Sequence, residues 1–126
     1  MHLTLRGIVL FAHGSRDARW REPVEAVAAR VAQSGPGVAV RCAYLEAARP
    51  DLPTAVNELV SEGVGSVDVL PLFLGVGKHL REDLPRLLTD LEAAYPAVTF
   101  RLRRAVGETP EVIDVLAQLA IKFEDA

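Results

Sequence analysis

Two runs of mainly apolar residues stand out in the sequence, at residues 7–12 and 67–74. Neither run alternates regularly between apolar and polar positions. This pattern is typical of strands that are buried on both faces of a parallel sheet. Pro71 cannot donate a hydrogen bond to a neighbouring strand, so we expect the second of these strands to end near that residue. The pattern therefore predicts two central strands.

Two other segments alternate in hydrophobicity, at residues 38–45 and 98–103. In the first, Val40, Cys42 and Tyr44 share one face and the charged Arg41 lies on the other. Such alternation is typical of strands that keep one face near solvent, which fits the edges of a sheet. With the strands numbered in chain order, the predicted sheet order is 2-1-3-4.

Helical spacing of apolar residues follows each predicted strand. Proline is tolerated best in the first turn of a helix. Pro23 therefore predicts that the first regular helix begins close to Glu22, and Pro85 predicts that the third begins near Glu82 or Asp83.

The second and fourth helices carry clearer end signals. Gly63 is expected to end the second helix. Thr109 and Pro110 form a typical helix start, with a capping residue followed by proline. The side of the fourth helix that we expect to be buried consists of Val112, Val115, Leu116 and Leu119.

Four strand–helix pairs predict an α/β fold, with a four-stranded parallel sheet of order 2-1-3-4 and helices on both faces. The length of 126 residues suits one core, so residues 1–126 are expected to form a single domain. In this order the chain leaves the first and third strands in opposite directions. The crevice beyond their carboxyl ends is the usual ligand site of such sheets.

Charge and cysteine content narrow the class of protein. The formal net charge of −3 provides no general attraction to nucleic acid or to an anionic membrane. The single Cys42 excludes an internal disulfide and fits a reducing compartment. The apolar run of residues 8–12 is too short for a signal peptide or a membrane span. We therefore expect a cytoplasmic protein with neither nucleic acid nor membrane as partner.

Two histidines follow the two central strands. His13 comes directly after the first strand, and His79 follows the glycine-containing loop after the third. Two neutral imidazoles with a nearby carboxylate suit a divalent cation such as iron, cobalt, nickel or zinc. Glu46, after the second strand, would be a third ligand or a proton acceptor, and Asp83 would orient His79. The alternative is that the histidines are structural hydrogen-bonding residues and Glu46 a solvated loop acid.

Basic residues gather at the same predicted edge. Guanidinium groups bind carboxylates in a bidentate manner, so a polycarboxylate ligand is a reasonable guest. Backbone donors at the start of the first helix would favour the same anionic groups. The cations are Arg16, Arg19, Arg49, Lys78 and Arg81, and the backbone donors would come from Gly14 and Ser15.

Three segments together point to a family. Residues 8–16 read IVLFAHGSR, Tyr44-Leu45-Glu46 is followed by Pro50, and residues 70–85 read LPLFLGVGKHLREDLP. In this order they resemble the short-form sirohydrochlorin cobaltochelatases, class II chelatases of cobalamin biosynthesis, and the resemblance covers most of the chain. It implies a three-layer, chelatase-like (flavodoxin-like) domain.

The resemblance also implies a cytoplasmic, homodimeric lyase that inserts a divalent metal into sirohydrochlorin or a related acidic tetrapyrrole without a nucleotide. The two active histidines of the family fall on His13 and His79. Cobalt is the metal that the resemblance favours. Related enzymes insert iron for sirohaem or nickel for coenzyme F430, so Fe²⁺ and Ni²⁺ stay open.

A mechanism follows from the chemistry of insertion. A free-base macrocycle holds two pyrrole N–H protons that must leave as the cation enters. We hypothesise that His13 and His79 flank the ring centre, where one holds the metal and the other accepts protons. The peripheral carboxylates would be held by Arg16, Lys78 and Arg81.

Other functions fit the sequence less well. A hydrolase would need a Gly-x-Ser-x-Gly nucleophile motif, which is absent, and Ala12 stands where a histidine phosphatase would carry arginine. The glycine loop at residues 75–77 lacks the full dinucleotide-binding fingerprint. A non-catalytic carrier of metal or tetrapyrrole with the same two-histidine pocket remains the alternative.

Overall fold

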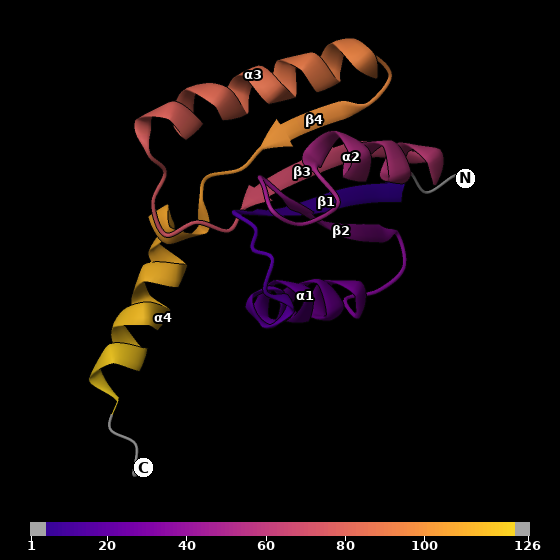
Figure 1. Cartoon of the computed structure of the whole chain (residues 1–126). Coiled ribbons are helices and arrows are strands. Elements are labelled where there is room, and N and C mark those ends of the chain that lie inside the picture. The colour runs from indigo at the N-terminus through magenta and orange to yellow at the C-terminus, as the bar shows by residue number, and fades with distance from the viewer. Residues whose placement is uncertain (1–4, 123–126) are drawn as a thin grey trace.

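The computed structural model of the protein describes residues 5–122. Four parallel strands form one sheet of order β2-β1-β3-β4, which confirms the predicted order (Figure 1). The third strand ends at Pro71, as expected. The strands are β1 (Leu5–Ala12), β2 (Val38–Tyr44), β3 (Val64–Pro71) and β4 (Thr99–Leu102).

Helices cover both faces of this sheet. In Figure 1, α1 lies on one face, whereas α2 and α3 lie on the other. Within residues 5–122, no helix is both long and apolar enough to span a membrane. The helical elements are α1 (Ala18–Ala32), α2 (Leu52–Ser61), α3 (Lys78–Ala94), the 3-10 turn η1 (Val106–Glu108) and α4 (Pro110–Ile121).

The predicted starts of the first and third helices were wrong. Both helices begin about one turn earlier, and Pro23 and Pro85 lie inside them. The extra turn of α1 is stabilised by Asp17, whose carboxylate accepts a hydrogen bond from the Arg19 backbone N–H at 2.9 Å. Both prolines are exposed, so water can hydrogen-bond the carbonyl that loses its helical donor.

The prediction of a buried side on the last helix was also wrong. No residue of α4 is buried, and Val115 and Leu119 are 54% and 61% exposed. The cause is the turn η1, where the Gly107 N–H donates to the Phe73 carbonyl at 2.9 Å. This bond holds η1 against the loop that follows β3, and α4 then extends away from the sheet (Figure 1).

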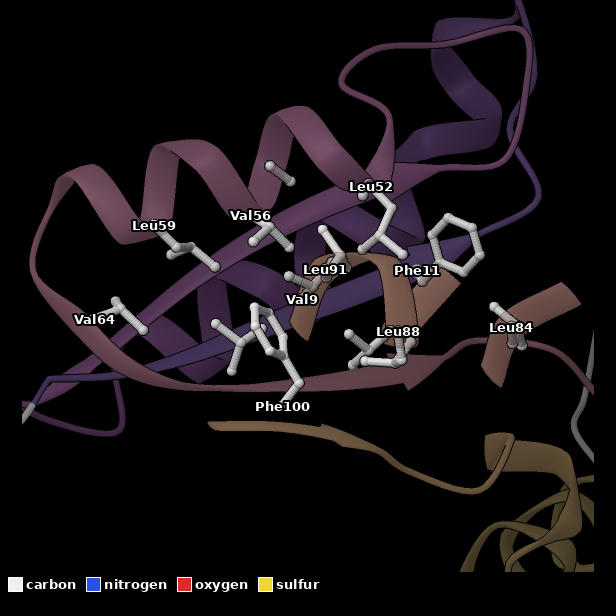
Figure 2. Packing of buried hydrophobic residues seen from close by; sticks show 14 residues of the cluster. Val9, Phe11, Leu52, Val56, Leu59, Val64, Leu84, Leu88, Leu91 and Phe100 are labelled. Atoms are coloured by element: carbon white, nitrogen blue, oxygen red, sulfur yellow. The ribbon is translucent and has the colours of Figure 1, made fainter. Parts of the chain in front are cut away.

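The main hydrophobic core lies between the sheet and the α2 and α3 layer. Figure 2 shows Val9 and Phe11 of β1 packing with Leu52, Val56 and Leu88 of the two helices. Complete burial of one such side chain stabilises the fold by about 1.5–3 kcal/mol. This core holds the ends of β1 and β3 in register.

A smaller core lies under α1 on the other face. It consists of Ala12, Val24 and Tyr44, with Cys42 packed against it. On the opposite side of β2, Arg41 pairs with Glu58 of α2 at 3.1 Å, as the alternation predicted. The α1 face is therefore covered mainly over β1 and β2.

Among the described residues, Asp68 of β3 is the one charged side chain that is buried. It accepts hydrogen bonds from Arg6 at 2.6 Å and Arg101 at 2.8 Å, and Arg103 lies 3.6 Å away. Burial by itself would raise the pKa of Asp68, but the hydrogen bonds from Arg6 and Arg101 outweigh it, and the pKa is lowered. The cluster links β1, β3 and β4 on the α1 side of the sheet.

Replacing Asp68 with asparagine should lower the free energy of unfolding by about 1–3 kcal/mol at pH 7, because charged hydrogen bonds are lost in a buried place. Since the folded pKa lies below the ordinary value of 3.8, this stabilisation is present above that value and is lost as the pH falls through the folded pKa. Urea unfolding at pH 7 and at acidic pH should therefore show a smaller decline for Asp68→Asn than for the wild type. The exposed Asp90→Asn is the control, and equal stability of both variants at pH 7 would contradict the assignment.

Candidate active site

The carboxyl ends of β1, β2 and β3 meet at one edge of the sheet. In the register of the sheet, Ala12 is level with Tyr44, and Phe11 is level with Pro71. His13 is the first residue after β1, and His79 is the second residue of α3, beyond the loop that follows β3. Both histidines are exposed. The topology therefore carries the two histidines to the same edge from neighbouring strands.

The structure joins His13 to Glu46. Nε2 of His13 lies 2.9 Å from Oε1 of Glu46. Backbone hydrogen bonds set up this contact, because the N–H of Leu45 donates to Ala12 at 2.9 Å and the N–H of Glu46 donates to His13 at 3.0 Å. These bonds continue the pairing of β1 and β2 beyond the strand ends, so the two side chains leave the backbone side by side.

Two unusual backbone positions shape this contact. Gly14 has a φ of 105°, and a Cβ atom there would lie 1.8 Å from the carbonyl oxygen of Glu46. Ala47 has a φ of 61°, which costs about 1–2 kcal/mol for a residue with a side chain. Strained backbone of this kind tends to occur at functional sites, and here it lies on both sides of the His13–Glu46 pair.

The contact with Glu46 bears on what His13 can do. The Glu46 carboxylate lies next to Nε2, so Nδ1, the other ring nitrogen, is the one left to bind a metal or to accept a proton. The side chains of His13 and Glu46 are 57% and 63% exposed, so a ligand can reach the pair from solvent.

The structure pairs Asp83, the predicted partner of His79, with an arginine. The carboxylate of Asp83 lies 3.8 Å from Arg86 on the same helix, and this ion pair is its partner in the structure. Orientation of His79 by Asp83 thus stays a prediction. Within residues 5–122, no group of three or more histidine, cysteine, aspartate or glutamate side chains is placed to hold a metal ion.

The surface near this edge is hollowed beside both candidate residues. A hollow of about 700 Å³ is lined by Glu46, Arg49 and other residues from the end of β2 to α2. A second hollow, of about 290 Å³, is lined by Leu45 and Leu80. Leu45 directly precedes Glu46, and Leu80 directly follows His79. The sequence neighbours of Glu46 and His79 therefore line the same hollow.

Two titratable groups of the larger hollow have shifted pKa values. Burial, followed by the nearby Cys42 and Glu25, raises the pKa of Tyr44 to about 12. Hydrogen bonding from Thr54 lowers the pKa of Asp51, whose carboxylate caps α2. Near neutral pH, Tyr44 therefore stays protonated and Asp51 stays ionised, so neither is suited to accept a proton from a ligand.

Arg16, Lys78 and Arg81 are all exposed, as expected for residues that meet a ligand from solvent. We expected Gly14 and Ser15 to offer backbone donors at the start of the first helix. This expectation was wrong, because α1 begins only at Ala18. The Asp17 carboxylate already caps that helix start. The role of Gly14 and Ser15 in substrate binding stays a prediction, without support from the helix start.

Two further arginines were missed by the sequence reasoning. A hollow of about 130 Å³ is lined by Arg81 of α3 and by Arg103 and Arg104, which follow β4. The predictions considered the loops after the first three strands only. The run of arginines at residues 101–104, at the carboxyl end of an expected edge strand, was the available signal.

A parallel sheet of this order, with histidines beyond its two central strands, has the fold of the metal chelatases. SirB, a sirohydrochlorin chelatase of Bacillus subtilis subspecies spizizenii solved with cobalt, is 21% identical, and the match covers 93% of this chain and 50% of SirB with a TM-score of 0.77. The CbiX family model matches residues 7–122, and the chain belongs to the CbiX family.

Other relatives agree with this assignment. The crystal structure of a CbiX protein from Marinobacter aquaeolei VT8 is 40% identical, and the match covers 91% of this chain and 93% of that one with a TM-score of 0.78. A sirohydrochlorin cobaltochelatase of Sulfolobus acidocaldarius is 26% identical over 92% of this chain and 90% of its own.

Matches to other sirohydrochlorin cobaltochelatases are shorter. The Methanopyrus kandleri protein is 35% identical, and the match covers 64% of this chain and 57% of its own length. The corresponding match to the Methanococcus aeolicus protein is 30% identical and covers 70% and 62%. This chain therefore aligns with about three fifths of the length of these two relatives.

Proposed function

We propose that this protein is a tetrapyrrole metal chelatase that inserts a divalent cation into sirohydrochlorin or a related acidic tetrapyrrole. The observation that carries the proposal is the His13–Glu46 pair at the carboxyl edge of the sheet in a member of the CbiX family. Relatives named sirohydrochlorin cobaltochelatase support the substrate class.

The chemistry of insertion requires both a metal donor and a proton acceptor. With its Nε2 beside the Glu46 carboxylate at 2.9 Å, His13 presents Nδ1 to the substrate. A carboxylate behind an imidazole fixes its orientation and strengthens it as a ligand or a base. His79, at the start of the helix that follows the neighbouring strand β3, supplies the second imidazole. One histidine holds the incoming metal and the other takes up the pyrrole protons.

We further propose that arginine and lysine side chains hold the peripheral carboxylates of the tetrapyrrole. Arg81 and Arg104 line one hollow, and Arg16 and Lys78 are exposed near the histidines in sequence. Guanidinium groups suit this task because they form paired hydrogen bonds with carboxylates. Gly14 and Ser15 are candidates for backbone contacts with the same groups.

Cobalt is the metal that we propose, with iron and nickel as alternatives. The relatives are named for cobalt, and one SirB structure holds cobalt while another holds Fe³⁺. Imidazole ligands suit all of these metals. We propose the cytoplasm as the compartment, since the one cysteine, Cys42, is free.

The test is insertion into sirohydrochlorin by the purified protein. Co²⁺, Fe²⁺ under anaerobic conditions, or Ni²⁺ is added, and the absorbance change on insertion is followed against the same mixture without protein. We expect many turnovers per protein, fastest with Co²⁺. One bound equivalent without turnover would instead support the second candidate, a carrier with the same two-histidine pocket.

A further inference from the structure

The loop that carries His13 connects β1 to α1 and contains neither helix nor strand. It spans residues 13–17 and ends at Asp17, the residue that caps α1. At its start, the His13 carbonyl accepts a hydrogen bond from the Glu46 N–H at 3.0 Å. Near its end, the Ser15 hydroxyl accepts one from the Asp17 N–H at 3.0 Å. These two bonds leave the carbonyl group of Ser15 to a third partner.

Arg21 of α1 is this third partner. Its guanidinium donates from Nη1 to the Ser15 carbonyl oxygen at 3.2 Å. Arg21 is the fourth residue of α1, and helical side chains point toward the start of their helix, so this long side chain reaches back to the loop. Since α1 packs on β2 and β1, the bond ties the loop to a well-packed part of the fold.

Arg21 differs from other arginines of the chain in its partners. Arg6, Arg41 and Arg101 pair with carboxylates. Arg21 is half-buried, yet within residues 5–122 no carboxylate lies within ion-pair distance of it. A partly buried cation without a counter-ion costs free energy. The hydrogen bond to Ser15, rather than an ion pair, therefore accounts for the place of Arg21.

The same guanidinium lies near the end of β2. Burial raises the pKa of Tyr44 to about 12, and the positive charge of Arg21 acts in the opposite direction, so the two groups are close together. Trp20 packs against the Tyr44 ring, with 6.4 Å between the ring centroids. Tyr44 is the last residue of β2, two positions before Glu46. The start of α1 therefore contacts both of the segments that carry the candidate pair.

We propose that Arg21 is a positioning residue for His13. This role rests on the proposed insertion of metal. By holding the Ser15 carbonyl, Arg21 keeps the loop in the conformation in which His13 lies 2.9 Å from Glu46. Gly14 lies between the held carbonyl and His13, and its backbone has the conformational freedom of glycine, so the loop needs an anchor on its far side. Arg21 acts through the loop and does not touch the tetrapyrrole or the metal.

Insertion kinetics with Co²⁺ and sirohydrochlorin test this role. Arg21→Met keeps the apolar stem of the side chain and removes its donors. We expect kcat to fall by about 10–100-fold, with KM for sirohydrochlorin close to that of the wild type. Arg21→Lys keeps a donor and should recover part of the lost rate. Arg30→Ala, in the last turn of the same helix, is the control and should match the wild type.

Two kinetic results would contradict the proposal. A higher KM with unchanged kcat in Arg21→Met would mean that Arg21 binds the substrate itself. Wild-type values of both constants would mean that the site does not depend on Arg21.

Amide hydrogen exchange tests the loop without any insertion. In Arg21→Met, the N–H groups of Asp17 and Glu46 should exchange about 2–10-fold faster than in the wild type, as expected when one hydrogen bond that holds their loop is lost. The Leu72 N–H, which donates to Phe11 at 2.8 Å at the same edge of the sheet, should be unchanged. Unchanged exchange at Asp17 and Glu46 would overturn the inference. If the wild type inserted no metal, the proposed function would fail, whereas faster exchange would still show that Arg21 holds the loop.

Discussion

Replacing His13 with alanine should lower the turnover rate of metal insertion by about 100-fold or more, and His79→Ala should have an effect of similar size. Proton transfer by a positioned imidazole contributes about 10²–10⁴-fold to a rate. Each variant removes one of the two imidazoles that the topology carries to the edge of the sheet. Initial rates with Co²⁺ and sirohydrochlorin measure the effect.

Glu46 should have a smaller effect than the two histidines. Glu46→Gln keeps an oxygen beside His13 Nε2 but removes the negative charge. We expect a loss of about 10–100-fold, because the partner of a working histidine tunes it without touching the reacting atoms. Circular dichroism should show that all three variants remain folded, since the three side chains are exposed. Wild-type rates in both histidine variants would remove the imidazoles from the chemistry.

Replacing Gly14 with alanine should damage both the fold and the site. The positive φ of Gly14 strains any residue with a side chain, at a cost of about 1–3 kcal/mol. The new Cβ would also lie 1.8 Å from the Glu46 carbonyl oxygen, and this backbone atom cannot move without displacing its loop. We expect a clear fall in the midpoint of urea unfolding and a loss of insertion rate, because Glu46 moves away from His13.

Gly75→Ala is the matched control for this variant. Gly75 lies in the loop after β3, its φ is not in the left-handed region, and no atom lies within 4 Å of a Cβ built there. Its stability should stay close to that of the wild type. If Gly14→Ala equalled Gly75→Ala in stability and rate, the close approach of the two loops would not matter for the site.

The order of the sheet was predictable because the burial of each strand is reflected in the hydrophobicity of its own residues. A strand between two others and between two helix layers is apolar on both faces, as residues 7–12 are, whereas an edge strand alternates. The same reasoning placed His13 and His79 beyond the central strands. These inferences need only the composition of each segment and the topology of parallel sheets.

The start of the first helix was predicted wrongly because the preference of proline for the first turn was outweighed by helix capping. Pro23 indicated a start near Glu22, but capping by Asp17 stabilises an earlier turn. The apolar side of α4 was identified correctly and its burial was not. The hydrophobic pattern shows that α4 has an apolar side, but it does not show where the chain before α4 is fixed. Here the hydrogen bond from Gly107 to Phe73 fixes the turn η1, and this turn sets the direction of α4.

The sequence by itself determined which strands lie in the centre of the sheet and which residues reach its carboxyl edge, since both follow from hydrophobicity along one segment at a time. Only the tertiary structure decided that His13 and Glu46 touch, that three arginines share Asp68, and that α4 leaves the sheet uncovered. The physical reason is that these features depend on backbone hydrogen bonds and close approaches between segments far apart in the chain. No pattern within one segment records them.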